Sequence, residues 1–150
     1  MLIKSHVVIT IFFCFLLFQN SSDFVLFLFI SIIATILPDL DTPQSKIGKK
    51  FKLFNFFMKH RGIIHSFTFL LIISLIILLF WNKILFPFIL GYSLHLVTDA
   101  LTLQGIRLFY PLKLKVPGFI KTGGIFELIL FIVFSLMDLF LLINKLYSVL

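Results

Sequence analysis

Two histidines, His60 and His65, lie at the start of a long apolar run in the segment HRGIIHS. A second candidate motif occurs later in the chain, where three residues separate His95 from Asp99. In an α-helix this i, i+4 spacing places both side chains on one face. A nitrogen and an oxygen on one face can bind a common metal ion, although the same pair also occurs as a plain hydrogen-bonded pair. The spacing therefore indicates a candidate metal site.

The composition indicates whether this site forms in a soluble protein or in a membrane protein. Of the 150 residues, 61% are hydrophobic, only 13% are charged, and the mean hydropathy is +1.18. A soluble domain of this length could not bury so much apolar surface, so we predict an integral membrane protein. The single cysteine, Cys14, excludes an intrachain disulfide and a thiolate metal cluster.

Five apolar stretches predict five transmembrane helices in a single helical domain covering residues 1–150. They are Val7–Phe18, Phe24–Leu37, Ile63–Trp81, Ile84–Leu103 and Ile125–Ile143. The last three approach the ~20 residues that cross a bilayer, and the first two reach that length only with flanking residues. Residues 1–20 could instead be a cleaved signal peptide, but no small-x-small cleavage site follows them. The segment Lys46–Lys59 alternates basic and aromatic residues and is expected to lie in the membrane interface. Gly105–Gly123 is expected to be irregular, with a short hairpin over the mouth of the bundle.

The basic residues orient the bundle in the membrane. Of 13 lysines and arginines, only Lys83 and Lys145 lie in the predicted outer regions. The positive-inside rule then places the N-terminus in the cytoplasm and the C-terminus outside, in the cell (inner) membrane. The net charge of +7 reflects this topology and attraction to anionic membrane lipids. A specific nucleic-acid partner is not expected.

This topology brings most of the ionisable residues to the cytoplasmic end. Four histidines and six acids can bind a metal or transfer a proton, and only Asp23 and Asp138 are expected elsewhere. Ionisable groups within a membrane need partners, because a charge at mid-bilayer costs about 2.5–3.5 kcal/mol on insertion scales. The converging residues are His6, Asp39, Asp41, His60, His65, His95, Asp99 and Glu127.

Several of these residues have alternative roles that the sequence leaves open. Asp41 could form an Asx turn with the following TPQS segment. His6 and His60 could simply be solvated at the interface, whereas His65 lies about a turn deeper. Glu127 in the first turn of a helix is favourable for the helix dipole without any function.

The arginines near this end have two interpretations. Arg61 satisfies the positive-inside rule on its own. Beside a metal ion, Arg61 or Arg107 would also suit a bidentate grip on a phosphate group.

Histidines and carboxylates without cysteine favour Zn²⁺, with Mn²⁺ or Fe²⁺ as alternatives. One ion with three or four protein ligands and an open position would be a hydrolytic centre, because the metal lowers the pKa of bound water. Ten ionisable groups would suffice for two ions, with Asp39 or Asp99 as a bridging ligand.

The motifs also resemble those of a known family, the YdjM-like inner-membrane proteins, which are predicted metal-dependent hydrolases. The resemblance covers most of the chain in the right order, and several motifs together are more specific than any one. They are His6, LPDLD (37–41), SKIG (45–48), HRGIIHS (60–66), GYSLHLVTDALT (91–102) and TGGIFE (122–127).

That family is distantly similar to zinc-dependent phospholipase C and related single-strand nucleases. This similarity implies that Asp39, His65, His95 and Asp99 form a first metal site, with His6 alongside. Where those soluble enzymes have a final HxxxE motif, this chain has Gly123 and keeps only Glu127. A second or third metal ion is therefore not implied.

We therefore predict a metal-dependent hydrolase with its site facing the cytoplasm. The predicted substrate is a phosphoester, either a phospholipid or a lipid-linked phosphate from the inner leaflet, attacked by a metal-bound hydroxide. Asp41 or Glu127 would act as the base, and Arg61 or Arg107 would bind the phosphate. The alternatives are a divalent-metal transporter or sensor, and a membrane protein with a structural metal. Transport sites usually lie near the midplane, whereas the polar residues here crowd one end.

Overall fold

The computed structural model describes residues 1–41, 63–112 and 114–149. These residues form five α-helices and one short 3₁₀-helix, and they contain no β-strand. Each α-helix coincides with one of the predicted apolar stretches, so the all-helical fold class is confirmed. The elements are α1 (Ile3–Phe18), α2 (Phe24–Ile36), η1 (Leu37–Asp41), α4 (Phe67–Phe80), α5 (Asn82–Ala100) and α6 (Ile125–Val149).

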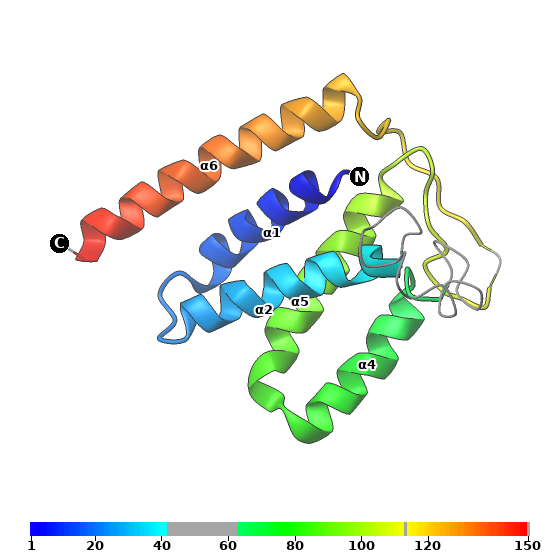
Figure 1. The fold of residues 1–150 in the computed structure, drawn as a ribbon, viewed down its shortest axis with the longest axis horizontal. Coiled ribbons are helices and arrows are strands. Elements are labelled where there is room, and N and C mark those ends of the chain that lie inside the picture. Colours follow the sequence, from blue (N-terminus) through cyan, green and yellow to red (C-terminus); the bar gives the residue numbers. More distant parts are fainter. Residues whose placement is uncertain (42–62, 113, 150) are drawn as a thin grey trace.

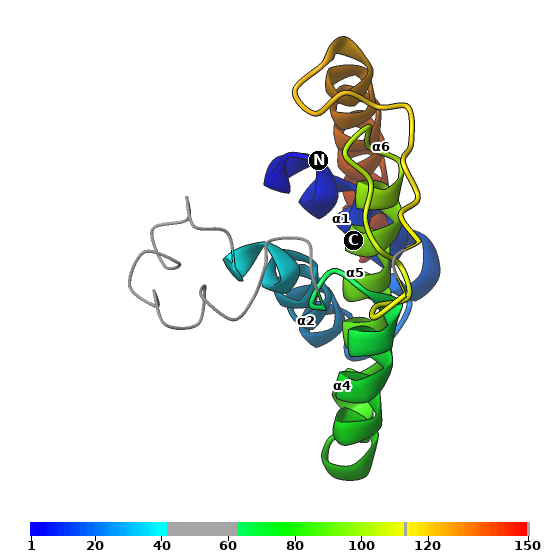
Figure 2. The same ribbon diagram turned by 90° about the vertical axis from the view of Figure 1, so that its right-hand side faces the viewer.

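Helices α6, α1, α5 and α4 lie in one layer, and α2 packs to one side of this layer against α1 and α5 (Figure 2). Helix α6 contacts α1, α1 and α2 pack on α5, and α4 packs on the far side of α5. Helices α4 and α6 therefore lie at opposite edges, and the layer is thin when viewed edge-on (Figures 1 and 2). The start of α1, η1, the start of α4, the end of α5 and the start of α6 all lie toward one end of the molecule (Figure 1). This is the convergence that the sequence predicts.

The closest helix contact joins α2 to α5 through small residues. A Cβ atom added to Gly91 would lie 2.0 Å from the backbone oxygen of Ser31, so only glycine permits this approach. The hydroxyl of Thr35 lies 3.1 Å from the backbone oxygen of Gly91. The hydroxyl of Ser31 donates across the same interface to the backbone oxygen of Pro87. Small and hydroxyl-bearing residues are typical of helix contacts in membranes, because they let backbones approach.

Three helices begin at positions different from those expected, and the smallest difference is in α5, which starts at Asn82 instead of Ile84. Helix α1 starts at Ile3 instead of Val7, because its first turn includes Lys4, Ser5 and His6, which a count of apolar residues omits. Helix α4 starts at Phe67 because Ser66 is its N-cap, and the Ser66 side chain accepts a hydrogen bond from the backbone N–H of Phe69.

The connection between α5 and α6 runs over the end of the bundle. Isolated bridges pair Ile106 with Val116 and Thr102 with Ile120, so the segment doubles back without forming a strand. The prediction of an irregular, hairpin-like segment is confirmed. Gly105 has a φ of 54°, and a Cβ atom there would lie 2.2 Å from the backbone oxygen of Val116. The tight return therefore requires glycine at this position.

The apolar surface is extensive. Over Ile125–Tyr147, helix α6 is long and apolar enough to cross a membrane, judged by length and composition, and only 6% of its most apolar window is buried. Among the described residues, the apolar helices α1, α2 and α4 are shorter than this length. The number of spans and their orientation therefore stay predictions. The predicted interfacial segment Lys46–Lys59 lies outside the described residues.

Candidate metal centre

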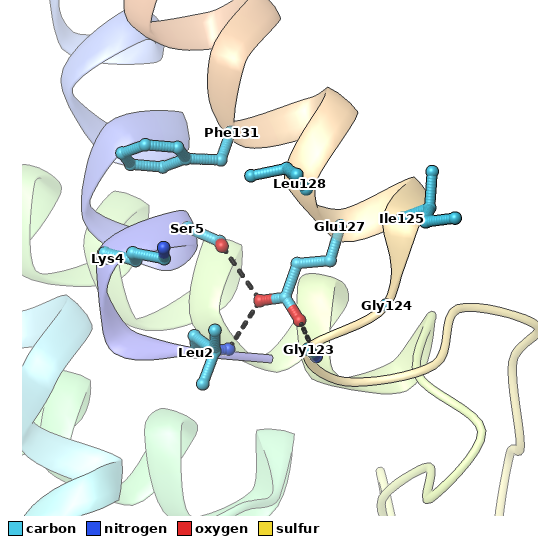
Figure 3. A pocket seen from close by; sticks show the side chains of 9 residues that line it. All are labelled: Leu2, Lys4, Ser5, Gly123, Gly124, Ile125, Glu127, Leu128 and Phe131. Carbon is cyan, nitrogen blue, oxygen red and sulfur yellow. Dashed lines mark hydrogen bonds between the residues drawn. The ribbon is translucent and has the colours of Figure 1, made fainter.

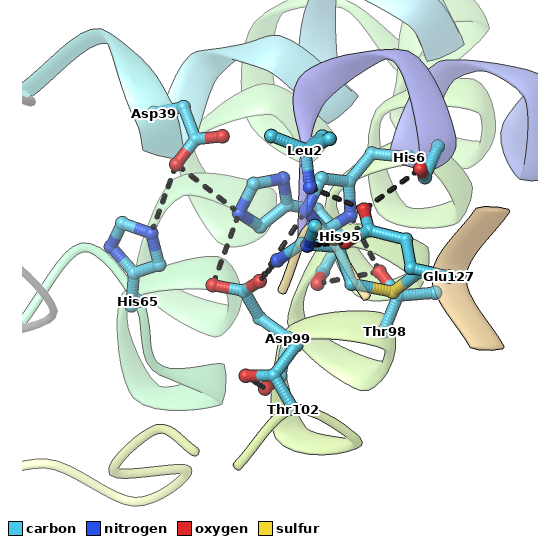
Figure 4. A network of polar contacts seen from close by, with 12 residues as sticks. Leu2, His6, Asp39, His65, His95, Thr98, Asp99, Thr102 and Glu127 are labelled. Carbon is cyan, nitrogen blue, oxygen red and sulfur yellow. Dashed lines mark hydrogen bonds and ion pairs between the residues drawn. The ribbon is translucent and has the colours of Figure 1, made fainter. Parts of the chain in front are cut away.

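Five predicted ligand residues come together at one end of the bundle. His6 comes from the first turn of α1, Asp39 from η1, and His65 from the residues just before α4. His95 and Asp99 come from the last two turns of α5. Figure 4 shows their side chains directed toward one another from these separate elements. Segments that are distant in the sequence thus form a single cluster.

The cluster is almost completely shielded from solvent. His6, His65, His95 and Asp99 are each at most 2% exposed, whereas Asp39 is half-buried. Buried ionisable groups of this kind are rare unless they are paired or bind a metal. Their concentration in so apolar a chain therefore requires a specific explanation.

The distances between donor atoms are longer than in most hydrogen bonds and short enough for a shared ion. Nε2 of His65 lies 3.6 Å from Oδ1 of Asp39, and Nε2 of His95 lies 3.9 Å from the same oxygen. Nε2 of His95 is also 4.0 Å from Oδ2 of Asp99, whose Oδ1 is 3.3 Å from Nε2 of His6. Nitrogen–oxygen hydrogen bonds are normally 2.7–3.2 Å long, so these four separations are longer than usual.

These separations can be compared with those of a metal site. Donors about 2.1 Å from a zinc ion at tetrahedral angles lie about 3.4 Å from one another. Two overlapping triads of the cluster satisfy this geometry approximately, since the donor atoms within each triad all lie within 4.8 Å of one another. The triads are His6, Asp39 and His95, and His65, His95 and Asp99. The donor atoms would therefore fit a divalent ion if the distances between them became slightly shorter.

His95 belongs to both triads, and its ring nitrogens form no hydrogen bond with the described residues. Neither Nδ1 nor Nε2 of this buried ring has a hydrogen-bond partner in the described residues. Leaving a buried polar atom unsatisfied typically costs 1–3 kcal/mol. A metal ion bound at Nε2 would remove part of this cost, so His95 carries the strongest local indication of a ligand.

Thr98 orients the ring of His6. The Thr98 hydroxyl lies 2.7 Å from the backbone oxygen of Leu94 and 3.0 Å from that of His95, to which it can donate its proton. It can then only accept from Nδ1 of His6, which is 2.6 Å away. This assignment leaves a lone pair on Nε2 of His6, the atom that faces Asp99. Partners of this kind fix the tautomer of metal-binding histidines.

The two carboxylates have different surroundings. Burial alone would raise the pKa of Asp39, but the neighbouring His65, His95 and His6 rings outweigh burial and lower this pKa. Asp39 is therefore ionised at neutral pH, as a metal ligand must be. Asp99 lies deeper, and its Oδ1 is contacted by the amino group of Met1. Both carboxylates thus lie next to positive or polarisable groups.

Glu127 is buried beside the cluster but binds the backbone. Its Oε1 accepts hydrogen bonds from the N–H of Leu2 at 2.6 Å and the hydroxyl of Ser5 at 2.8 Å, and its Oε2 accepts from the N–H of Gly123 at 2.6 Å. Figure 3 shows these bonds joining the start of α6 to the start of α1, beside a cavity of about 170 Å³ that Lys4 also lines. The carboxylate therefore holds in place the turn of α1 that carries His6.

The remaining predicted site residues are placed less completely. His60 and Arg61 lie outside the described residues, and the backbone of Asp41 ends η1. Arg107 is exposed in the connection between α5 and α6. The predicted roles of these four residues, and the base role of Glu127, stay predictions.

Two residues that contribute to the site were not found by sequence reasoning. Thr98 was missed because a threonine in an apolar helix carries no motif, although it lies three residues after His95 on a nearby face. Ser5 was missed because the first predicted span begins at Val7. A signal was present in both cases, since each polar residue neighbours a predicted ligand in the sequence.

The fold and site together define an all-helical protein with an extensive apolar surface and a buried histidine–carboxylate cluster at one end. Comparison with family models gives a match to the YdjM inner membrane protein family over residues 1–149. The chain belongs to this family and is a membrane protein. The predicted resemblance to the YdjM-like proteins is thereby confirmed.

A curated relative is the YvsG protein of Bacillus subtilis (strain 168). The two sequences are 33% identical over an alignment of 103 residues, and the match covers 63% of this chain and 64% of YvsG. The matched region thus spans less than two thirds of the relative. No solved structure matches the chain. The distant similarity to phospholipase C therefore stays a prediction.

Proposed function

We propose that this protein is a metal-dependent hydrolase that cleaves phosphoesters at the membrane. The observation that carries the proposal is the approach of five buried or half-buried donors, from α1, η1, the start of α4 and α5, to separations near those of a zinc site. The donor set of three histidines and two carboxylates suits Zn²⁺ first, and Mn²⁺ or Fe²⁺ second.

The ligands would be Asp39, His65, His95 and Asp99, with His6 alongside. When bound, the ion would acidify a water molecule and polarise a phosphoryl oxygen. The chain supplies the orientation: Thr98 accepts the Nδ1 proton of His6, and η1 brings Asp39 to the end of α5. A site held by several elements in this way is preorganised before a substrate arrives.

Cationic and proton-accepting groups complete the proposed chemistry. Arg61 and Arg107 are the candidates to bind a phosphate, because an arginine offers paired donors in a plane. Asp41 is the candidate base, since Glu127 is engaged by three hydrogen bonds at the start of α1. A base must reach the proton it removes, and a carboxylate with both oxygens engaged is less available.

We further propose that all five α-helices cross the membrane with the metal cluster at the cytoplasmic end. The extreme bias of basic residues toward that end supports this orientation. Apolar side chains exposed on every helix, such as Leu17, Phe29, Leu79 and Phe140, support contact with lipid along the whole bundle. The site would then lie at the level of the inner-leaflet phosphates, which favours a phosphate-bearing lipid as the substrate.

The decisive experiment combines metal analysis with a phosphoester panel. The His95→Ala variant should keep its membrane insertion and helical content, lose bound metal, and lose hydrolysis at least 100-fold. Asp39→Asn should behave in the same way, whereas Asp23→Asn, the matched change in the exposed turn between α1 and α2, should leave both properties unchanged. Hydrolysis by metal-free protein would overturn the proposal. Metal binding without hydrolysis of any phosphoester would instead support a structural or transport role.

A further inference from the structure

An apolar groove runs along α4 from Phe67, which lies two residues after His65 of the candidate metal centre. It encloses about 390 Å³, and its lining comes from α4, α5 and the connection that follows α5. The lining residues are Phe67, Thr68, Leu70, Leu71, Ser74, Ile89 and Phe109. Phe67, Leu70, Leu71 and Ser74 recur at helical spacing, so they form one stripe about 10 Å long.

The groove and the metal cluster share one end. Phe67 lies two residues after the buried His65, and its backbone N–H donates to the backbone oxygen of Leu108 at 2.8 Å. The ring of Phe109 lies 6.3 Å from that of Phe67 and closes the same end of the groove. The segment from Arg107 to Phe109 therefore brings a cationic residue and an apolar wall to this end.

Deeper in the groove, a polar atom lacks a partner. The Oγ of Ser74 is buried, the residue is only 8% exposed, and the hydroxyl has no hydrogen-bond partner in the described residues. A serine in an apolar helix usually donates to a backbone oxygen in the preceding turn. Its unsatisfied hydroxyl lines the groove, where it could meet an ester carbonyl or a polar group of a bound molecule.

These features match one kind of occupant. The cationic and metal-binding end suits a phosphate, and the apolar remainder suits a hydrocarbon chain. The match of charge to charge and of apolar surface to apolar chain selects an anionic phospholipid in preference to a water-soluble phosphoester. We propose that the groove binds an acyl chain of a phosphate-bearing lipid whose phosphate lies at the metal cluster. This inference rests on the proposed function.

The binding site can be tested without turnover. The full-length protein is reconstituted into phosphatidylcholine vesicles containing phosphatidic acid that carries a diazirine in its acyl chain, and cross-links are mapped by mass spectrometry after irradiation. Labelling should concentrate on the groove residues of α4 and α5, at least threefold above the exposed residues Leu75, Leu78 and Leu79 of α4. Equal labelling of both faces would overturn the proposal.

A pair of substitutions sharpens the test. Ser74→Phe fills the groove and should reduce this labelling several-fold, whereas Leu75→Phe adds a similar ring on the lipid-exposed face and should not. Ser74→Phe should also lower the ratio of kcat/KM for long-chain phosphatidic acid to kcat/KM for a short-chain, soluble phosphate ester at least tenfold. Equal losses for both substrates would contradict a role for the groove in binding the chain.

The two proposals can fail separately. Concentrated labelling of the groove in a protein that hydrolyses neither substrate would refute the hydrolase and retain a lipid-binding groove. Hydrolysis of the short-chain ester with uniform labelling would retain the hydrolase and refute the groove.

Discussion

The imidazole rings of His6 and His95 stack face to face, with centroids 4.2 Å apart and planes inclined by 19°. The two rings come from different helices, α1 and α5, and both are buried. Two protonated rings at this separation would repel strongly in a buried site. At least one ring must therefore be neutral, which is the form that binds metal ions. The stacking thus brings two imidazole rings from different helices together, next to the carboxylate of Asp99.

Removal of divalent metal should lower the thermal unfolding temperature of the protein in detergent. Without an ion, the cluster keeps two carboxylates and several unsatisfied nitrogens in a buried site, which is unfavourable. Adding Zn²⁺ should restore the unfolding temperature, with a gain in unfolding free energy of about 2.7 kcal/mol at 100 times the dissociation constant. Differential scanning fluorimetry across a zinc titration measures this effect. The His95→Ala variant should respond much less, and an equal response in that variant would contradict the site.

Thr98→Val should weaken metal binding by about 10–100-fold, the usual effect of removing the partner of a metal-binding histidine. The change removes the hydroxyl that accepts from Nδ1 of His6 while preserving the shape of the side chain. Competition with a chromophoric chelator gives the affinity. Thr98→Ser keeps the hydroxyl and should bind nearly as well as the natural protein. Unchanged affinity in the valine variant would mean that Thr98 does not orient His6.

Glu127→Ala should destabilise the protein and weaken metal binding without changing the shape of the pH–rate profile. The three hydrogen bonds of this carboxylate hold the first turn of α1, so their loss should cost about 2–4 kcal/mol of unfolding free energy. Glu127→Gln retains an acceptor and should cost less. Unfolding in detergent and kcat/KM as a function of pH are the measurements. A lost acidic limb with normal stability in the glutamine variant would instead identify Glu127 as the general base.

Gly91→Ala should lower both stability and metal affinity, although residue 91 lies a full turn from the ligand His95. The added Cβ would lie 2.0 Å from the backbone oxygen of Ser31, so α2 must move away from α5. Overpacking of this kind typically costs 1–3 kcal/mol. Because α2 leads into η1, the movement should also displace Asp39. Val97→Leu, which enlarges a half-exposed position on the same helix, is the control and should change neither property.

The arrangement at the ends of the helices is predictable from the sequence, because it follows from chain topology. Apolar stretches joined by short turns must run antiparallel, so ligands at alternate helix ends meet at one end of the bundle. In the same way, the sequence predicts that His65 joins the cluster and Asp138 does not. His65 lies at the start of a helix, whereas Asp138 lies within α6. His65 is indeed buried in the cluster.

The contacts within the cluster are not predictable in the same way, because they depend on how each helix is rotated. The near-continuous apolar character of these helices gives no amphipathic stripe from which to read a rotation. The bond between His6 and Thr98 and the bonds of Glu127 to the first turn of α1 therefore become visible only in three dimensions. The same rotation places Ser74 in the groove, where its sequence context of isoleucine and leucine suggested nothing.

The bonds from Glu127 to Leu2 and Ser5 join α6 to α1, which is synthesised well before it. During membrane insertion, the first turn of α1 therefore lacks its bonds to Glu127 until α6 has entered the bundle. His6 is the proposed ligand that this turn carries, so the complete set of proposed ligands should assemble only after α6 is in place. A chain that ends before α6 would therefore hold an ion in the proposed metal centre poorly.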